Sequence, residues 1–280
     1  MSVTLQEAFL RKYPKNNKTV KYFEEANGCP LAWENITKAR LQIYVDYLKT
    51  KIAPNSVKAY CSRLKTVLNL YSDEHDVPDG VDKILSIRKD ASEHVFLTVE
   101  EISRLIKYKP RSRAEWIIKN QFLMGCLTGA RHSDYVRFDK HNFNGKNLSY
   151  VSIKTHHKTE IPLSQMLRRV IAENDDLGFN GVEFTGVYFN RIIKKICHRI
   201  GMDEILTLYN FGKTKTQEKW KYVTSHTARR TFATNLYLNG VDLYTISQLC
   251  GHSSVEVTKT YICCNPNIDD KVMQYFNLFT

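Results

Sequence analysis

Apolar residues recur at spacings of three and four along residues 1–92, a pattern typical of amphipathic helices. The longest such run begins at Pro54, and the face predicted to be buried consists of Val57, Tyr60, Cys61, Leu64, Val67, Leu68 and Tyr71. A second helix is predicted from Thr37, with a buried face of Leu41, Tyr44, Tyr47 and Leu48. Two weaker helices fit Leu5–Tyr13 and Thr19–Ala26. We therefore expect this part of the chain to be mainly helical.

The polar faces of the two stronger helices are basic. Lys58, Arg63 and Lys65 lie on that of the longer helix, and Lys38 and Arg40 lie on that of the other, where we expect them to be exposed. Such a face either keeps a helix soluble or contacts the phosphates of a nucleic acid. The local pattern leaves both interpretations open.

A change in character follows this helical part. Acidic and turn-forming residues cluster at 73–80, and a polar stretch comes after them. Thr98 and Glu101 then form a capping box, which signals the start of a new helix. We therefore predict a helical domain of residues 1–90, a linker at about 87–95 and a second domain of residues 96–280.

The second domain combines helical and strand patterns. Helices are predicted at 98–107, 113–127, 132–138, 163–173, 186–200, 227–239, 242–250 and 254–262. Alternating apolar residues around a polar centre at 147–163 predict a β-hairpin, whose tip or edge carries Lys154 and Lys158. A last short helix with an apolar stripe is predicted at 268–279. The predicted fold class is mainly α with a small antiparallel β-sheet.

Composition narrows the class of protein. The chain has 41 basic and 29 acidic residues, a net charge of +12, and such a basic folded chain indicates a polyanionic partner, most often nucleic acid. Apolar residues make up 42%, which excludes wholesale disorder, and no apolar run is long enough for a membrane span. Residues 1–15 lack the apolar core of a signal peptide, and the seven cysteines contain no C-x-x-C pair. We therefore expect a cytoplasmic protein with reduced thiols.

Two motifs place a cation where an anion could bind. Thr128-Gly129 ends an apolar helix and puts Arg131 at the head of the next one, beside free backbone N–H groups. Lys154 lies on the predicted hairpin. Either residue taken singly is most simply a surface cation.

Two further motifs combine histidine with arginine or tyrosine. His226 and Arg229 are three residues apart and share one helix face, which suits an oxyanion. His252 follows a glycine, and Tyr261 comes nine residues later. Each of these residues alone could equally be a packing residue.

Taken together, the order Arg, Lys, His-x-x-Arg, His, Tyr resembles the catalytic set of the tyrosine recombinases, the phage integrase family. The motifs cover residues 96–280, whereas residues 1–92 match only in size, helicity and charge. The resemblance implies a helical core-DNA-binding domain and an α+β catalytic domain that form a C-shaped clamp on DNA. The residues that match the catalytic set are Arg131, Lys154, His226, Arg229, His252 and Tyr261.

The resemblance also implies how the reaction proceeds. Tyr261 would attack a DNA phosphodiester and form a 3′-phosphotyrosyl intermediate, while Arg131, Arg229 and His252 stabilise the charge that develops on the phosphate oxygens. Each arginine offers a planar fork that matches two of these oxygens and stays charged. Rejoining then needs no ATP, and no metal ion or other cofactor is implied.

Proton transfer is assigned to the remaining motif residues by the same resemblance. Lys154 matches the general acid that protonates the leaving 5′-oxygen, although Lys158 lies close enough in sequence to exchange with it. His226 would accept the proton of the tyrosine or position its hydroxyl, and Asp134 would orient a neighbouring site residue.

The implied partner is double-stranded DNA with inverted-repeat core sites. The residues expected to contact it are Lys38, Arg40, Lys58, Arg63, Lys65, Lys158 and Arg230. The protein is expected to be a monomer when free and a homotetramer on DNA, with the helix at 268–279 packing either on its own domain or on a neighbouring protomer. We expect a site-specific recombinase or integrase; the alternatives are a type IB topoisomerase or telomere-resolving enzyme, and a non-catalytic DNA-binding relative.

Overall fold

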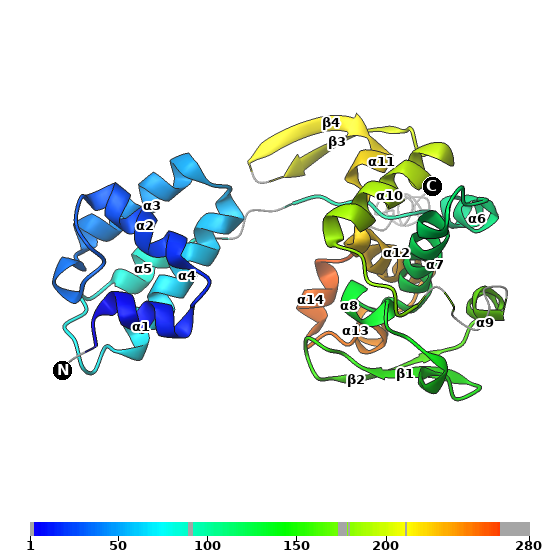
Figure 1. Ribbon diagram of the computed structural model, residues 1–280, viewed down its shortest axis with the longest axis horizontal. Helices are drawn as coiled ribbons and strands as arrows, with labels where there is room; N and C mark the ends of the chain where they lie inside the picture. The colour runs from blue at the N-terminus through cyan, green and yellow to red at the C-terminus, as the bar shows by residue number, and fades with distance from the viewer. Residues whose placement is uncertain (1–2, 89–91, 173–177, 179, 211, 264–280) are drawn as a thin grey trace, which may run out of the picture. The chain divides into compact units, whose positions relative to one another are not determined.

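The computed structural model describes residues 3–88, 92–172, 178, 180–210 and 212–263, which form two compact units (Figure 1). Unit 1 comprises Met1–Ser92 with Tyr209–Lys215, and unit 2 comprises Glu93–Leu208 with the residues from Thr216 onward. The apolar stripe predicted at 268–279 lies outside the described residues. Within the described ranges, no helix is both long and apolar enough to cross a membrane.

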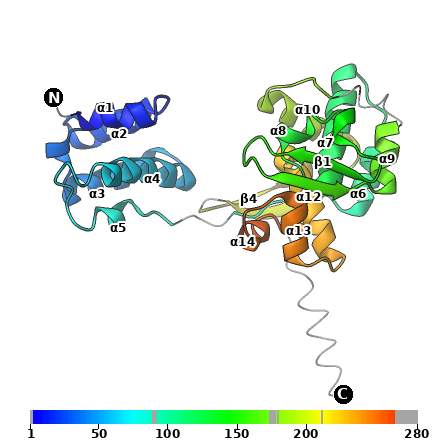
Figure 2. The ribbon, with the colours of Figure 1, turned by 90° about the horizontal axis from the view of Figure 1, so that it is seen from below.

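Unit 1 is built from helices in two layers. Figure 2 shows α1 and α2 in one layer and α3 and α4 in the next, with α5 packed against the second. The four helices predicted from apolar spacing are confirmed, whereas the short α5 and the 3-10 turn were not predicted. The elements are α1 (Leu5–Lys12), α2 (Asn17–Asn27), η1 (Trp33–Asn35), α3 (Lys38–Lys51), α4 (Pro54–Leu70) and α5 (Val81–Leu85).

The core of unit 1 contains the apolar faces of α3 and α4. The prediction of these faces needs correction at three tyrosines. Tyr47, Tyr60 and Tyr71 were predicted to be buried, but all three are only half-buried. A phenol hydroxyl needs a polar partner, so a tyrosine at the edge of an apolar face keeps that end near the surface. The Tyr47 hydroxyl, for example, donates to a carboxylate oxygen of Glu25 over 2.6 Å.

Arg40 was predicted to be exposed, and this was wrong. Its side chain is half-buried, and its guanidinium donates to the amide oxygen of Asn35 in the η1 turn. The contact joins the start of α3 to the preceding turn, which the helical periodicity of α3 alone does not reveal.

Unit 2 is organised around α7 (Arg113–Thr128), which is buried along most of its length. α12 (Ser225–Leu238) packs along α7, and Figure 1 shows the two helices side by side at the centre of the unit. The remaining helical elements are α6 (Val99–Lys107), α8 (His132–Tyr135), η2 (Lys140–Asn142), α9 (Gln165–Ala172), α10 (Gly186–Arg199), α11 (Lys219–Tyr222), α13 (Leu243–Cys250) and α14 (Val255–Lys259).

Each helix predicted between residues 98 and 262 is present, but two are shorter than expected. α8 is a single turn rather than a helix to residue 138, and α14 ends at Lys259 rather than at residue 262. After α14 the backbone N–H of Tyr261 donates to the carbonyl oxygen of Thr258 over 2.8 Å, a tighter i→i+3 turn than an α-helix allows.

The strands of the described residues form two hairpins, so the predicted fold class of mainly helix with little antiparallel sheet is confirmed. β1 (Asn147–Val151) pairs with β2 (Lys158–Pro162), with Val151 opposite Lys158, and Lys154 lies in the connecting turn. A second hairpin, β3 (Ile205–Asn210) and β4 (Lys213–Glu218), was not predicted. β4 reads KTKTQE and contains no apolar residue, so its sequence carries no alternating pattern to detect.

Candidate active site

The Thr-Gly turn after α7 holds the most deeply buried cation of the site. Arg229, on α12, is 1% exposed, and its Nη1 donates to the carbonyl oxygen of Gly129 over 2.8 Å. Gly129 caps α7 with a φ of +67°, and a Cβ there would lie 2.3 Å from the ring of Phe232. Only glycine fits this turn. The turn places the Gly129 carbonyl where it binds one side of the Arg229 guanidinium.

A second set of contacts joins α8 to the β1–β2 hairpin. Arg131 Nη1 donates to the hydroxyl oxygen of Ser152 over 3.0 Å, and that hydroxyl donates to Asp134 Oδ2 over 3.1 Å. Asp134, which is 3% exposed, also accepts from the backbone N–H of Ile153 over 3.0 Å. Asp134 therefore orients Arg131 through Ser152, a residue that the sequence motifs do not single out, and holds the turn that carries Lys154.

Tyr261 lies against His252 and two arginines. Its ring stacks on the imidazole of His252 with centroids 4.7 Å apart. The guanidinium carbons of Arg229 and Arg230 lie 5.2 and 5.6 Å from its centroid, within reach of a cation–π attraction. His252 Nδ1 is 3.0 Å from the hydroxyl of Thr258 on α14, so the imidazole is held from the side of that helix.

The electrostatic environment of this cluster is positive. Burial, followed by Arg229 and Arg131, lowers the pKa of His252 to about 3. Burial is also the largest cause of a lowered pKa at His226, followed by the charges of the neighbouring arginines and Lys154. Both imidazoles are therefore neutral at pH 7, and the fixed charges around them are cationic.

Several donors in the cluster have nothing to bind among the described residues. Arg229 Nε and Nη2 and His252 Nε2 are buried and have no hydrogen-bond partner there. A buried donor left without an acceptor costs about 1–3 kcal/mol. Three such atoms beside one tyrosine ring indicate a site for an anion with several oxygen acceptors.

The two hairpin lysines have different surroundings. Lys154 is exposed in the turn, and its charge contributes to the lowered pKa of His226. Lys158 is at the start of β2, and its Nζ pairs with Glu160 over 2.8 Å. Lys154 thus contributes to the charge around His226, whereas Lys158 has an acidic partner on its own strand.

The residues predicted to contact DNA from unit 1 have different surroundings. Lys58 and Lys65 line an open groove beside α4, and Lys38 is exposed at the start of α3. Arg63 lies elsewhere on α4, with its guanidinium carbon 5.7 Å from the ring centroid of Tyr60.

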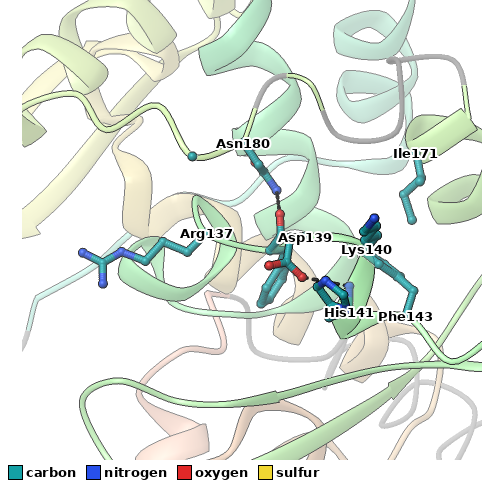
Figure 3. Close-up of a pocket in the computed structure, with 9 residues that line it drawn as sticks. Arg137, Asp139, Lys140, His141, Phe143, Ile171 and Asn180 are labelled. Carbon is teal, nitrogen blue, oxygen red and sulfur yellow. Dashed lines mark hydrogen bonds between the residues drawn. The ribbon is translucent and has the colours of Figure 1, made fainter.

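A cavity of about 730 Å³ lies elsewhere in unit 2 and includes none of the six predicted catalytic residues. Figure 3 shows Asp139, Lys140 and His141 of its lining grouped together, with Arg137 extending away from them. Arg137 pairs with Glu183 over 2.7 Å. The full lining is Arg137, Phe138, Asp139, Lys140, His141, Phe143, Ile171, Asn180 and Gly181.

Comparison with known proteins relates the chain to one family. A profile of the phage integrase family matches residues 95–267. The integrase of Escherichia phage P2 is 24% identical over 249 residues, which cover 86% of this chain and 65% of that protein, so the chain spans less than two thirds of that relative. Tyrosine recombinase XerC of Rickettsia bellii is 24% identical over 261 residues, covering 88% of this chain and 83% of that protein.

Structural comparison shows the same fold in a solved protein. A fragment of lambda integrase, in a structure of its dimer bound to a COC′ core site, superposes with a TM-score of 0.68 at 15% sequence identity. The match covers 95% of this chain and 97% of that fragment.

Proposed function

Because this chain belongs to the phage integrase family, we propose that it cleaves and rejoins DNA strands at specific sites through a bond between Tyr261 and a 3′-phosphate. The observation that carries the proposal is the set of unpartnered buried donors on Arg229 and His252 beside the Tyr261 ring. A phosphodiester supplies the oxygen acceptors these donors lack, and the tyrosine supplies a nucleophile next to it.

In the first step, the Tyr261 hydroxyl oxygen attacks the phosphorus and the bond to the 5′-oxygen breaks. His226 takes the phenolic proton, a role that suits an imidazole kept neutral by its lowered pKa. Lys154 gives a proton to the leaving 5′-oxygen. Arg131 and Arg229 hold the non-bridging oxygens, whose negative charge increases in the transition state.

His252 donates to the same oxygens through Nε2 when the Thr258 hydroxyl donates to Nδ1. The products are a 3′-phosphotyrosyl protein and a free 5′-hydroxyl. Attack by the 5′-hydroxyl of another strand reverses the step, so the number of phosphoester bonds is conserved without ATP.

The finer assignments follow from this proposal. Residues 1–90 bind the DNA core site and residues 96–280 catalyse, with the basic residues named above contacting phosphates. The substrate is duplex DNA with inverted-repeat core sites. The protein is a monomer when free, and four protomers assemble into a tetramer on two duplexes. The protein is then associated with the nucleoid while it is bound. Products joined across two duplexes, rather than relaxation of one, are the expected outcome.

Replacement of Tyr261 by phenylalanine tests the nucleophile. The substrate is a duplex that the wild-type protein selects from a randomised library. A nick near the centre of the selected site lets the short strand with the free 5′-hydroxyl diffuse away after cleavage, so that the strand cannot be rejoined. The wild-type protein should form a detergent-resistant covalent adduct, and Tyr261→Phe should form none while binding the duplex with unchanged affinity. Tyr244→Phe, at a tyrosine that is 65% exposed on α13, is the matched control and should form the adduct normally. An adduct at wild-type level in Tyr261→Phe would refute the assignment.

A further inference from the structure

The polar face of α4 lines a groove whose chemistry is more varied than a simple phosphate-binding surface. The groove has a volume of about 540 Å³ and lies within unit 1, between α4 and the segment that follows α5. Its α4 side presents two lysines together with side chains that both donate and accept hydrogen bonds. Its lining residues are Lys58, Ser62, Lys65, Thr66, Asn69, Leu85, Ser86, Ile87 and Arg88.

An acidic residue of α5 binds two of these groove residues. Asp82 Oδ1 pairs with Lys65 Nζ over 3.1 Å and accepts from the side-chain amide of Asn69 over 3.3 Å. Lys65 Nζ also donates to the hydroxyl of Ser86 over 3.0 Å. The Asp82 side chain is 56% exposed, so it stays accessible to a bound molecule. The bonds from Lys65 and Asn69 lower its pKa, which keeps the carboxylate ionised.

A carboxylate at a surface that binds phosphates has two physical consequences. It cancels the charge of Lys65 and repels the DNA backbone, which weakens binding to every sequence. The repulsion is offset where a base presents an amino group, because a carboxylate accepts from cytosine N4 in the major groove. Asn69 and Lys65 are side chains of the types that read adenine and guanine there.

We propose that Asp82, Lys65 and Asn69 form a base-reading cluster, in which Asp82 makes the affinity of the α4 groove depend on DNA sequence. This inference rests on the proposed binding of DNA and extends it from phosphate contact to specificity. Asp82 holds the Lys65 ammonium and the Asn69 amide in one arrangement, and its own charge disfavours duplexes without a matching amino group.

The test is selection from a randomised duplex library, followed by affinity measurements on the selected duplex and on a scrambled duplex of equal length. Asp82→Asn should bind the scrambled duplex more tightly. It should also lose discrimination at one or two adjacent base pairs, by roughly 5- to 150-fold per position. Asn69→Ala should lose discrimination at the same positions, because it removes a side chain of the same cluster.

Asp46→Asn is the matched control on α3. Asp46 is also bound by a lysine and an amide, Lys49 over 2.8 Å and Gln42 over 2.9 Å. Neither of these partners lines the groove, whereas both partners of Asp82 do. This variant removes the same charge from the same unit and should keep the wild-type base preference. Thermal melting of each variant checks that unit 1 stays folded.

The outcomes separate this inference from the proposed function. If Asp82→Asn and Asn69→Ala select the wild-type sequence, or Asp82→Asn and Asp46→Asn change affinity alike, the cluster does not read bases and the inference fails alone. If the wild-type protein binds no duplex at all, the proposed function fails with it.

Discussion

Arg229 and His252 are placed to bind an anion, and their burial lowers the stability of the anion-free protein. Arg229 is almost fully buried, and among the described residues its guanidinium has a carbonyl, not a carboxylate, as its hydrogen-bond acceptor. A buried cation without an ionic partner is costly, because its desolvation is not repaid by a neighbouring charge. The imidazole of His252 is likewise buried beside cations and therefore kept neutral. Both features become favourable once an anion occupies the site.

The neutral state of His252 predicts how stability depends on pH. The folded pKa is about 3, below the value of about 6.5 for an unfolded histidine, so the unfolded chain binds more protons on acidification. The free energy of unfolding should therefore fall below pH 6.5, by up to about 1.4 kcal/mol per pH unit from this residue. Urea unfolding of the DNA-free protein from pH 7.5 to 5 should show a steeper loss for the wild type than for His252→Gln. Parallel curves for the two proteins would mean that His252 is not held neutral.

At the scale of elements, the β1–β2 hairpin separates two lysines that the sequence could not distinguish. The turn carrying Lys154 is fixed by Asp134, which accepts from the Ile153 backbone, whereas Lys158 pairs with Glu160 along β2. A strand position opposite a pairing partner constrains a side chain to one face, while a turn can extend toward a neighbouring helix. The charge of Lys154 is among those that lower the pKa of His226, whereas Lys158 has an ion-pair partner on its own strand.

Exchanging each lysine for alanine tests this assignment. Lys154→Ala should slow strand cleavage about 10²- to 10⁴-fold if the ammonium protonates the leaving oxygen. A substrate with sulfur at the bridging 5′ position should restore the rate, because a thiolate leaves without a proton. Lys158→Ala removes an exposed ion pair and one proposed phosphate contact, so it should weaken DNA binding slightly but change the cleavage rate little at saturating DNA. Sulfur rescue of Lys158→Ala but not of Lys154→Ala would reverse the two roles.

At the scale of the whole molecule, positive charge is spread over the chain rather than confined to one segment. Residues 1–92 carry 15 basic and 11 acidic residues, and the remaining residues carry the other 26 basic and 18 acidic ones. Both parts are therefore net positive, as expected if both contact one polyanion.

The distribution of charge predicts a steep dependence of DNA affinity on salt. If residues of both parts neutralise six to ten phosphates, affinity for a selected duplex should fall about 10³- to 10⁵-fold between 50 and 200 mM salt. Fluorescence anisotropy with a labelled duplex measures the slope of log affinity against log salt. A protein of residues 1–92 alone should give a shallower slope, and an equal slope would show that unit 2 adds no phosphate contact.

Local pattern was sufficient for the longer helices and for the residue types of the candidate site. The spacing of apolar residues predicted the longer helices of both units, because a helix repeats its buried face every three to four residues regardless of its neighbours. The short α5 and α11 span too few residues to repeat such a face. The order of Arg131, Lys154, His226, Arg229, His252 and Tyr261 likewise identified the family from short motifs.

Tertiary packing decided which of these residues touch and through which intermediaries. Three contacts join segments that are distant in sequence. Arg229 donates to the carbonyl of Gly129, the Ser152 hydroxyl lies between Arg131 and Asp134, and Asp82 of α5 pairs with Lys65 of α4. β4 has no apolar residue, so its pairing with β3 left no trace in the hydrophobic pattern. Such contacts depend on where whole elements dock, and no periodicity along one segment encodes the position of another.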